Sequence, residues 1–263
     1  IGNLNDISQR ALNILQNVSL VACEDTRQTK KIMNKFNISN KLISFNKHNS
    51  LKKISYIINN LRDGKSVALV SDAGMPSICD PGEDLVKKVK SFEIDIICIP
   101  GPCAALTALV SSGLPASSFI FEGFLPKKKI EREKILLEIS QHRKTTILFE
   151  SPHRFKKLLK ELLVFCGEGR EIHISRELTK KFEEHIGTTI ERAIDIFENK
   201  EIVGEITLVI KGICETKNFV INKSHLKKEL NELIDAGLSL SAASKYLAKK
   251  SNTTKRIIYN LYQ

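Results

Sequence analysis

The residues best suited to hold a ligand gather in one segment, 71–82, which reads Ser-Asp-Ala-Gly-Met-Pro-Ser-Ile-Cys-Asp-Pro-Gly. It follows an apolar run (67–70) that predicts a buried strand, and it precedes a helical pattern (83–89). Glycine lets a ligand approach the backbone closely, and proline holds a loop in shape before the ligand arrives. Because ligands of open α/β sheets bind at the carboxyl ends of strands, the segment predicts a binding loop; the alternative is a rigid turn between core elements.

A second loop of the same kind follows another apolar run, at residues 100–105 (Pro-Gly-Pro-Cys-Ala-Ala). Its alanines allow helix, sheet or ligand to approach closely. The alternative is an ordinary helix start with proline in the first turn. Two such loops at neighbouring strand ends predict a crevice more strongly than either loop alone.

Three further predicted strands end in charged side chains, in the segments 24–27 (Glu-Asp-Thr-Arg), 150–154 (Glu-Ser-Pro-His-Arg) and 176–181 (Arg-Glu-Leu-Thr-Lys-Lys). Acids beside threonine and arginine can hydrogen-bond a polar substrate or orient a base. They can equally cap the helix that follows, where an acid suits the helix dipole. Arg154 could bind a phosphate or a carboxylate. A single histidine such as His153 more often forms a local hydrogen bond than acts in catalysis.

The charge balance favours a polyanionic partner. The chain has 41 lysines and arginines against 30 acids, a net charge of +11. Residues 121–129 place phenylalanines next to three lysines, a combination that can stack on bases and meet phosphates. The alternatives are an exposed linker at 121–129 and, for the whole chain, a drift in composition toward Lys, Ile and Asn.

The elements that must position these loops alternate between strands and helices over the first hundred residues. Runs typical of strands cover residues 18–23, 42–45, 67–70 and 94–99. Helical patterns cover residues 7–15, with Asp6 as the N-cap, and 26–36, 51–61 and 83–89. The alternation predicts an α/β fold with a mostly parallel sheet that is covered on both faces.

Small residues at 111–118 mark a boundary, and a second α/β unit follows it, with strands at 145–149, 172–174 and 206–210 and helices at 131–139 and 155–163. Gly167-Glu168-Gly169 follows a helix and is therefore interpreted as the turn that ends it. We expect an N-terminal α/β domain at 1–113, a second α/β domain at 117–213 and a C-terminal helical module at 220–263.

The C-terminal module has three helical stripes, at 226–234, 242–247 and 257–261, joined at Gly237 and near Asn252, after a last apolar pair at Val220-Ile221. This arrangement is similar to a helix-turn-helix module. The alternative is a small packing domain with a solvated basic face. Its basic residues are Lys223, Lys227, Lys228, Lys245, Lys249, Lys250, Lys255 and Arg256.

Several classes of function find no support. The six cysteines are scattered without metal-ligand spacing, which predicts free thiols in a reducing cytoplasm and no metal site. No apolar run is long enough to span a membrane. The motifs of P-loop phosphoryl transfer, serine hydrolysis, zinc proteolysis and glycine-rich dinucleotide binding are absent.

Taken together, these segments resemble the ribosomal RNA small subunit methyltransferase I family, within the tetrapyrrole methylase superfamily. The matching segments run in the family's order over residues 1–212. They are 1–4 (Ile-Gly-Asn-Leu), 24–27, 71–82, 100–105, 121–126, 150–154, 176–180 and 204–205. The C-terminal module resembles the family's tail more weakly.

The resemblance implies a fold and an activity. It implies two α/β domains with S-adenosylmethionine in the cleft between them, a homodimer, and methylation of a cytidine 2′-hydroxyl in the decoding region of small-subunit (16S) ribosomal RNA. It implies cofactor contacts from Asp72, Gly74, Met75, Pro76, Ile78, Gly101, Pro102, Ala104 and Phe149. The enzyme must align the ribose hydroxyl with the methyl group and accept its proton. The candidates for this role are Glu24, Asp25, Glu150 and Glu177, and those for binding RNA phosphates are Arg27, Lys127, Lys128, Lys129, Arg154 and Arg176.

Two departures from the family pattern stand out. The family begins with an apolar strand ending in Thr-Pro before Ile-Gly-Asn, whereas this sequence starts at Ile1. Either the sequence is a fragment or the protein itself lacks that strand, in which case a position of its first sheet is expected to be empty. Cys79 and Cys103 stand where serine is usual, which weakens a hydroxyl hydrogen bond. Two rival functions share the fold: a methyltransferase of tetrapyrrole carbon, against which the charge and the basic tail argue, and a non-catalytic RNA-binding protein.

Overall fold

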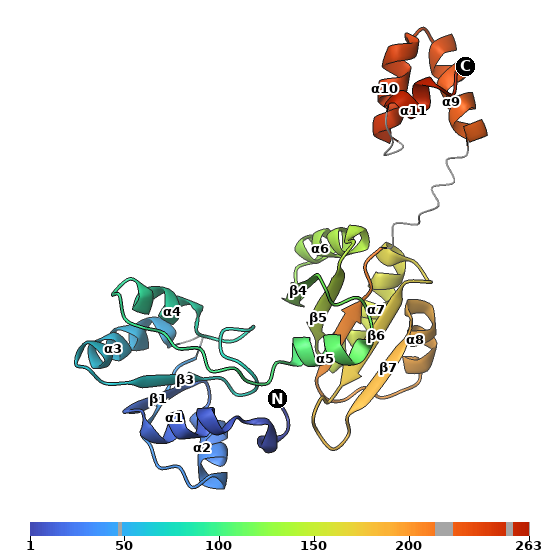
Figure 1. The fold of residues 1–263 in the computed structure, drawn as a ribbon. Helices are drawn as coiled ribbons and strands as arrows, with labels where there is room; N and C mark the ends of the chain where they lie inside the picture. Colours follow the sequence, from blue (N-terminus) through green and yellow to red (C-terminus); the bar gives the residue numbers. More distant parts are fainter. Residues whose placement is uncertain (47–48, 214–222, 251–254, 263) are drawn as a thin grey trace. The chain divides into compact units, whose positions relative to one another are not determined.

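The computed structural model describes residues 1–46, 49–213, 223–250 and 255–262, and the chain folds as two units, Ile1–Ile213 and Cys214–Gln263 (Figure 1). The first unit carries two β-sheets, one formed by residues 20–70 and the other by residues 119–210. The second unit is helical in its described residues. The α/β class predicted from the sequence is confirmed, whereas the proposed boundary at 113–117 inside the first unit stays a prediction.

The first sheet is parallel, as the alternation of elements predicts. β1 (Leu20–Cys23) lies between β2 (Leu42–Ser44) and β3 (Val67–Val70). A short 3-10 turn (Leu4–Asp6) precedes the helices of this region, which are α1 (Gln9–Asn17), α2 (Thr26–Lys35), α3 (Ser50–Arg62) and α4 (Glu83–Lys90).

Both faces of this sheet are buried because successive strand side chains point to opposite sides. Ala22 of β1 belongs to a core cluster that includes Ile57 of α3. Its neighbour Val21 packs in a different cluster with Leu15 of α1 and Met33 of α2. Burial on two sides explains why β1 is apolar at every position.

Two local predictions for this region were wrong. Residues 94–99 form no strand, and Ile96 and Ile97 are 42% and 70% exposed. A strand needs a neighbour to complete its hydrogen bonds, and within the described residues no strand pairs with this segment or with the outer edge of β3. Asp6 does not cap the first helix: Ser8 does, and its Oγ accepts a hydrogen bond from the Ala11 N–H at 3.1 Å.

The second sheet is mixed, with the order β4-β5-β8-β6-β7. β4 (Phe119–Phe124) is parallel to β5 (Thr145–Glu150), whereas β8 (Ile206–Ile210) is antiparallel to both β5 and β6 (Glu171–Arg176). β7 (Glu184–Thr189) adds an antiparallel edge. The helices of this region are α5 (Ala104–Ser112), α6 (Lys129–Gln141), α7 (Pro152–Cys166) and α8 (Ile190–Phe197).

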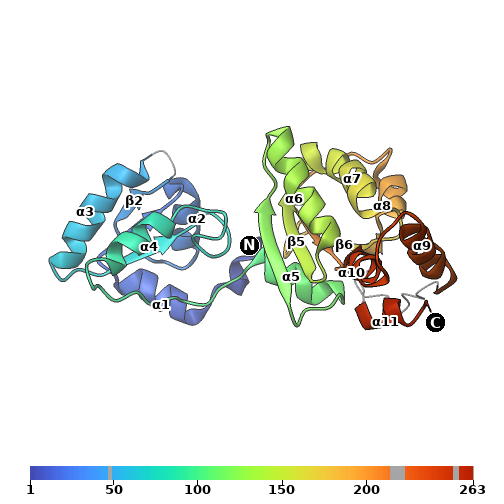
Figure 2. The same ribbon diagram turned by 90° about the horizontal axis from the view of Figure 1, so that it is seen from above.

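Successive side chains of the central strands point to opposite faces of this sheet, and each face has its own apolar core. Leu148 and Leu208 pack with residues of α6, α7 and α8, whereas Ile147 and Val209 pack with α5. Figure 2 shows α5, α6, α7 and α8 around this sheet. The antiparallel pairing sets Ile206, the first residue of β8, opposite Glu150, the last residue of β5. The start of β8 therefore lies beside the loop that follows β5.

The second unit contains α9 (Lys223–Asp235), α10 (Leu240–Lys250) and α11 (Lys255–Tyr259) around buried Leu230, Ala243, Leu247 and Ile258. The three predicted helices are confirmed. The predicted start of this module at 220, the apolar pair Val220-Ile221 and the join near Asn252 lie outside the described residues. In the described part of the chain, no helix combines the length and apolarity needed to cross a membrane.

Candidate active site

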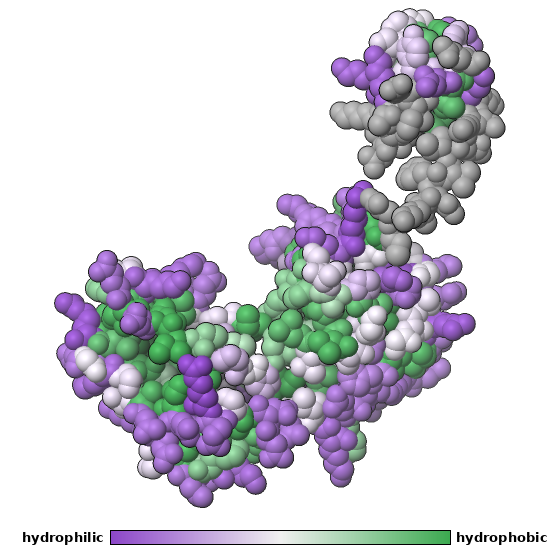
Figure 3. Space-filling view, viewed as in Figure 1, coloured by the Kyte–Doolittle hydropathy of each residue, from purple (hydrophilic) through white to green (hydrophobic). Residues whose placement is uncertain are grey.

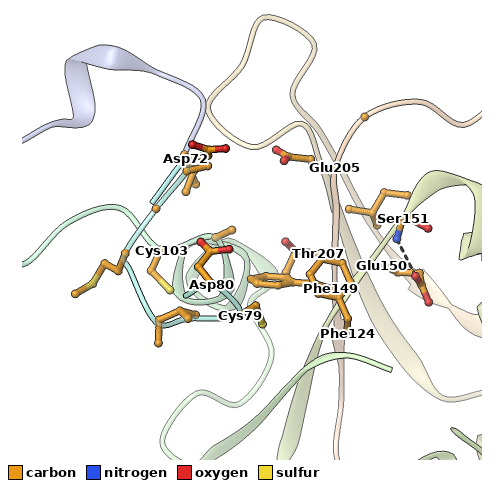
Figure 4. A pocket seen from close by; sticks show the side chains of 18 of the residues that line it. Asp72, Cys79, Asp80, Cys103, Phe124, Phe149, Glu150, Ser151, Glu205 and Thr207 are labelled. Carbon is orange, nitrogen blue, oxygen red and sulfur yellow. Dashed lines mark hydrogen bonds between the residues drawn. The ribbon is translucent and has the colours of Figure 1, made fainter. Parts of the chain in front are cut away.

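The first unit contains a cavity of about 440 Å³ where several loops meet (Figure 4). Its walls come from the loops after β1, β3 and β5, from the first turns of α5 and α7, and from the start of β8. Both Gly/Pro loops contribute to this cavity, as predicted, although the second loop follows no strand and adds only Cys103 and Ala104 to the wall. The sequence-predicted residues that line it are Glu24, Asp72, Gly74, Met75, Ile78, Ala104, Phe149 and Glu150.

Gly74 is required by the shape of the loop after β3. Its φ is +77°, and a Cβ atom built there would lie 3.3 Å from the carbonyl oxygen of Pro102. Ser71 Oγ donates to the Gly74 carbonyl at 3.0 Å and closes the turn. Gly101 and Pro102 thus lie behind Gly74 and Met75 rather than in the cavity wall, and Pro76 also lies outside the wall.

The loops after β1 and β3 are tied to each other. The Asp72 carboxylate accepts a hydrogen bond from the Asp25 N–H at 3.0 Å. In return, the Asp72 N–H donates to the Glu24 carboxylate at 3.5 Å. Because β1 and β3 are neighbouring parallel strands, their carboxyl ends meet, and two acids reach the same side of the cavity.

Asp25 has a structural task. It is the N-cap of α2, accepts from the Arg27 N–H at 2.8 Å and forms an ion pair with the Arg27 guanidinium at 2.6 Å. Hydrogen bonds from Arg27 lower the pKa of Asp25 to about 2. Asp25 does not line the cavity, so the capping alternative describes its position better.

Glu150 contributes to the cavity wall, but its carboxylate is buried behind it. The side chain has no exposed surface and lies between Arg154, at 2.6 Å, and Arg132, at 3.4 Å. Its Oε1 also accepts from the Ser151 N–H at 2.8 Å (Figure 4). Arg132 continues the network to Glu161 at 2.7 Å. Glu150 thus anchors the start of α7.

Glu177 sits behind the cavity and supports Glu205, which lines it. Lys180 Nζ joins the two carboxylates, at 2.7 Å from Glu177 and 2.8 Å from Glu205. Glu177 also accepts from the Glu205 N–H at 2.9 Å, and the hydrogen bond from Lys180 lowers the pKa of Glu177. The Glu205 side chain is 74% exposed, and Figure 4 places it across the cavity from Asp72.

Aromatic rings and two helix starts complete the site. Phe149 and Phe124 both line the cavity, with ring centroids 5.6 Å apart, and Phe121 packs edge-on against Phe149. α5 and α7 begin at the wall. No side chain caps the first N–H groups of α5, whereas α7 begins with Pro152, which has no N–H. Uncapped N–H groups at a helix start favour an anionic group. In the described residues, no cluster of three or more His, Cys, Asp or Glu side chains is arranged to hold a metal ion.

The predicted RNA-contacting residues lie in different surroundings. Lys127, Lys128 and Lys129 are exposed at the start of α6, and Arg27 is 87% exposed. Arg154 and Arg176 are instead engaged by Glu150 and Glu184, and each donates to a backbone carbonyl. In the C-terminal unit Lys227, Lys245 and Lys255 are exposed, whereas the side chains of Lys223, Lys228, Lys249, Lys250 and Arg256 lie outside the described part.

Four polar residues of the wall were missed as site residues: Asp80, Ser151, Glu205 and Thr207. Asp80 and Ser151 belong to segments that the sequence analysis had singled out, so only their individual roles were missed. Glu205 and Thr207 come from β8 and its lead-in, and only the antiparallel pairing brings them beside the end of β5. The signal available in the sequence was Gly204-Glu205, a glycine and an acid just before an apolar run.

Sequence comparisons place this chain among methyltransferases. The model of the tetrapyrrole (corrin/porphyrin) methylases matches residues 1–194. The ribosomal RNA small subunit methyltransferase I of Synechocystis sp. is 40% identical over 261 residues, which cover 99% of this chain and 94% of that protein. The protein of the same name from Bacillus subtilis is 38% identical over 269 residues, covering 100% of this chain and 91% of that one.

Solved structures share the fold at lower identity. A cobalt precorrin-4 methyltransferase superposes with a TM-score of 0.60 at 18% identity, covering 80% of this chain and 90% of that chain. A uroporphyrin-III C-methyltransferase from Thermus thermophilus complexed with S-adenyl homocysteine gives a TM-score of 0.54 at 14% identity, covering 79% and 92%.

Proposed function

We infer that this chain, which belongs to the ribosomal RNA small subunit methyltransferase I family within the tetrapyrrole methylases, methylates small-subunit ribosomal RNA with S-adenosylmethionine as the methyl donor. We further propose a cytidine 2′-hydroxyl in the decoding region as the acceptor. The observation that carries the proposal is the polar and aromatic cavity at the two Gly/Pro loops, in a chain whose relatives match it along almost its whole length.

The cavity fits this cofactor in size and chemistry. Small-molecule sites enclose roughly 300–1,000 Å³ and combine apolar walls with a few polar groups. The uncapped N–H groups at the start of α5 suit the carboxylate of the methionine part. The acids on the wall suit the ammonium, the sulfonium and the ribose hydroxyls, and Phe149 and Phe124 suit the adenine ring.

We propose Glu24 and Glu205 as the carboxylates that accept the proton. When the ribose oxygen bonds to the methyl carbon, the carbon–sulfur bond breaks and its electron pair stays on sulfur, while the hydroxyl proton passes to a carboxylate. Glu24 and Glu205 line the cavity, and the Glu205 carboxylate stays largely exposed although Lys180 pairs with it at 2.8 Å. Asp25 and Glu177 do not line the cavity, and the Glu150 carboxylate is buried between two arginines. Alignment of the hydroxyl by the cavity walls supplies a further part of the rate.

The direct test is transfer of a labelled methyl group from S-adenosylmethionine to purified small ribosomal subunits, followed by mapping of 2′-O-methylated nucleotides. Cells with and without the gene should differ at the same nucleotide. Methylation of a tetrapyrrole instead of RNA would contradict the proposal, and so would a protein that binds RNA but not S-adenosylmethionine.

Gly74→Ala tests the assignment of the cavity to the cofactor. The new Cβ is strained by the positive φ and presses on Pro102, so we expect the affinity for S-adenosylmethionine to fall about 10-fold or more, measured by calorimetric titration. The matched control is Gly64→Ala, because Gly64 has the same φ, +78°, but no atom within 4 Å of the added Cβ. Equal affinities in the two variants would contradict the assignment.

We propose a homodimer in the cytoplasm as the active form, in line with the superfamily resemblance. Sedimentation equilibrium of the full chain measures this directly. A monomer that still transfers methyl groups would contradict the dimer without touching the proposed reaction.

A further inference from the structure

A second groove, of about 590 Å³, runs along α2 and the segment after it. Its floor is apolar: Met33 is 3% exposed and Ile38 8% exposed, and Leu42 of β2 adjoins them. Its rim carries Arg27, Lys30 and other polar side chains of α2 and the following segment. An apolar floor under a basic rim suits a nucleotide, whose base has a flat apolar face and whose phosphate is anionic.

The rim is basic because of helical spacing. Arg27, Lys30 and Asn34 stand at positions i, i+3 and i+7 of α2, which share one helix face. Among the described residues that line the groove there is no acid, although Asp25 beside it pairs with Arg27. Lys30 is exposed and has no ion-pair partner among the described residues. Figure 3 shows hydrophilic side chains gathered over α2.

The groove begins next to the proposed active site. Glu24 lines the cavity, and Thr26 and Arg27, two and three residues later, line the groove. The Asp25 between them donates its N–H to Asp72 of the cavity wall. Asp25 also holds the Nε and Nη2 atoms of Arg27 and so fixes the direction of the guanidinium. A strand of RNA leaving the cavity on this side would meet the groove next.

We propose that this groove binds the RNA next to the methylated nucleotide, with Arg27 and Lys30 on phosphates and the apolar floor under a base. The inference rests on the proposed function and adds to it the path of the substrate. Phosphate contacts of this kind set the register of the RNA and make binding depend on salt.

The test compares two lysines of one helix. Lys30→Gln removes a charge from the rim, and Lys35→Gln removes the same charge from an exposed position of α2 that does not line the groove. Affinity for a small-subunit RNA fragment that contains the target nucleotide is measured from low to high salt. We expect Lys30→Gln to weaken binding about 3- to 10-fold at low salt and to reduce the slope against salt by about 1, and Lys35→Gln to change neither.

Affinity for S-adenosylmethionine, measured on all three proteins, should stay equal and shows that the fold is intact. If both variants bind RNA equally well, whether unchanged or weakened, the proposed role of the groove in RNA binding is contradicted. If Lys30→Gln lowers the affinity for whole small subunits but not for the RNA fragment, the groove contacts a ribosomal protein, and its role in RNA binding is contradicted as well. Failure of the wild-type chain to methylate small-subunit RNA would instead overturn the proposed function.

Discussion

At the scale of single residues, a carboxylate's neighbours decide its role more than its position in a motif. Glu150 ends a strand and is one of the predicted candidates for the proton acceptor, yet its carboxylate is buried between two arginines. The sequence alone assigned no role to Glu205, yet its exposed carboxylate lines the cavity. Removing Glu150 would leave Arg154 without its ion-pair partner and Arg132 with Glu161 alone, whereas removing Glu205 would change the cavity.

The two carboxylates proposed as proton acceptors can be separated by substitution. If one of them is the acceptor, Glu24→Gln or Glu205→Gln should lower the rate of methyl transfer about 100-fold or more and leave the affinity for S-adenosylmethionine within a few-fold. Glu201→Gln is the matched control, because Glu201 is exposed in the same segment and lies outside the cavity. Full rates in both variants would remove both residues from the proposal.

His173 makes the stability depend on pH. It is 5% exposed, its Nε2 lies 3.2 Å from His185 Nδ1, and burial, with a smaller effect of His185, lowers its pKa from 6.5. Below pH 6.5 the unfolded chain therefore takes up the proton first, so the free energy of unfolding should fall as pH drops from 6.5 toward the folded pKa. Above pH 6.5 this contribution is complete.

The measurement is urea unfolding of the wild type and of His173→Gln at pH 7.5 and 5.5. The wild type should lose more stability between the two pH values than the variant does. The groups around His173 and His185 also include Ser175 and Glu183, which are hydrogen-bonded to His185. Helix α5, which packs on β6, carries no titratable side chain. The same loss in both proteins would show that another group causes the dependence.

At the scale of elements, each wall of the cavity is attached to the core by a polar contact between loops. Asp72 ties the loop after β3 to the loop after β1. Glu150 ties β5 to α6 through Arg132 and to the end of β4 through Arg154, which donates to the Leu125 carbonyl at 3.2 Å. Lys180 ties the segment after β6 to the lead-in of β8. These contacts hold the loops in place before a ligand binds.

Arg132 is the residue whose loss should disturb these elements most. Arg132→Met leaves the buried Glu150 with one cation fewer and should lower the free energy of unfolding by about 3–5 kcal/mol, measured with urea. The double variant Arg132→Met with Glu150→Gln should recover part of the loss, because the uncompensated charge is then gone. A double variant less stable than the single one would contradict this explanation.

At the scale of the whole molecule, the chain combines two units with separate cores and a net charge of +11. The charge raises the rate and affinity of encounter with a polyanion such as ribosomal RNA and makes both depend on salt. The described lysines of the C-terminal unit are exposed and add to the positive charge that the chain presents to solvent.

Because the two units have separate cores, we expect each unit to unfold independently of the other. Leu148 packs in the second sheet and Leu230 in the C-terminal helices, and neither is exposed. In calorimetry of the full chain, Leu230→Ala should lower the temperature of one transition and Leu148→Ala that of another, each at a cost of about 2–5 kcal/mol. A single transition that both variants shift equally would contradict independent unfolding.

The sequence by itself determined the local elements and the segments of the site. Apolar periodicity located β1, β3, β5 and β8, because a buried strand or helix face must be apolar whatever it packs against. It missed the edge strand β7, whose Glu-His-Ile-Gly-Thr-Thr is polar on a half-exposed face. It also placed a strand at 94–99, where the required neighbour is not among the described strands.

The tertiary structure alone decided which of the acids face the cavity. Glu150 and Glu205 lie far apart in the chain and become neighbours only through the antiparallel pairing of β5 and β8. The packing of helices and loops around a carboxylate decides whether it pairs with an arginine or faces the open cavity. Such long-range contacts cannot be predicted from the local sequence. Residue types along the chain therefore predicted where a site would form, and packing assigned each residue its part in it.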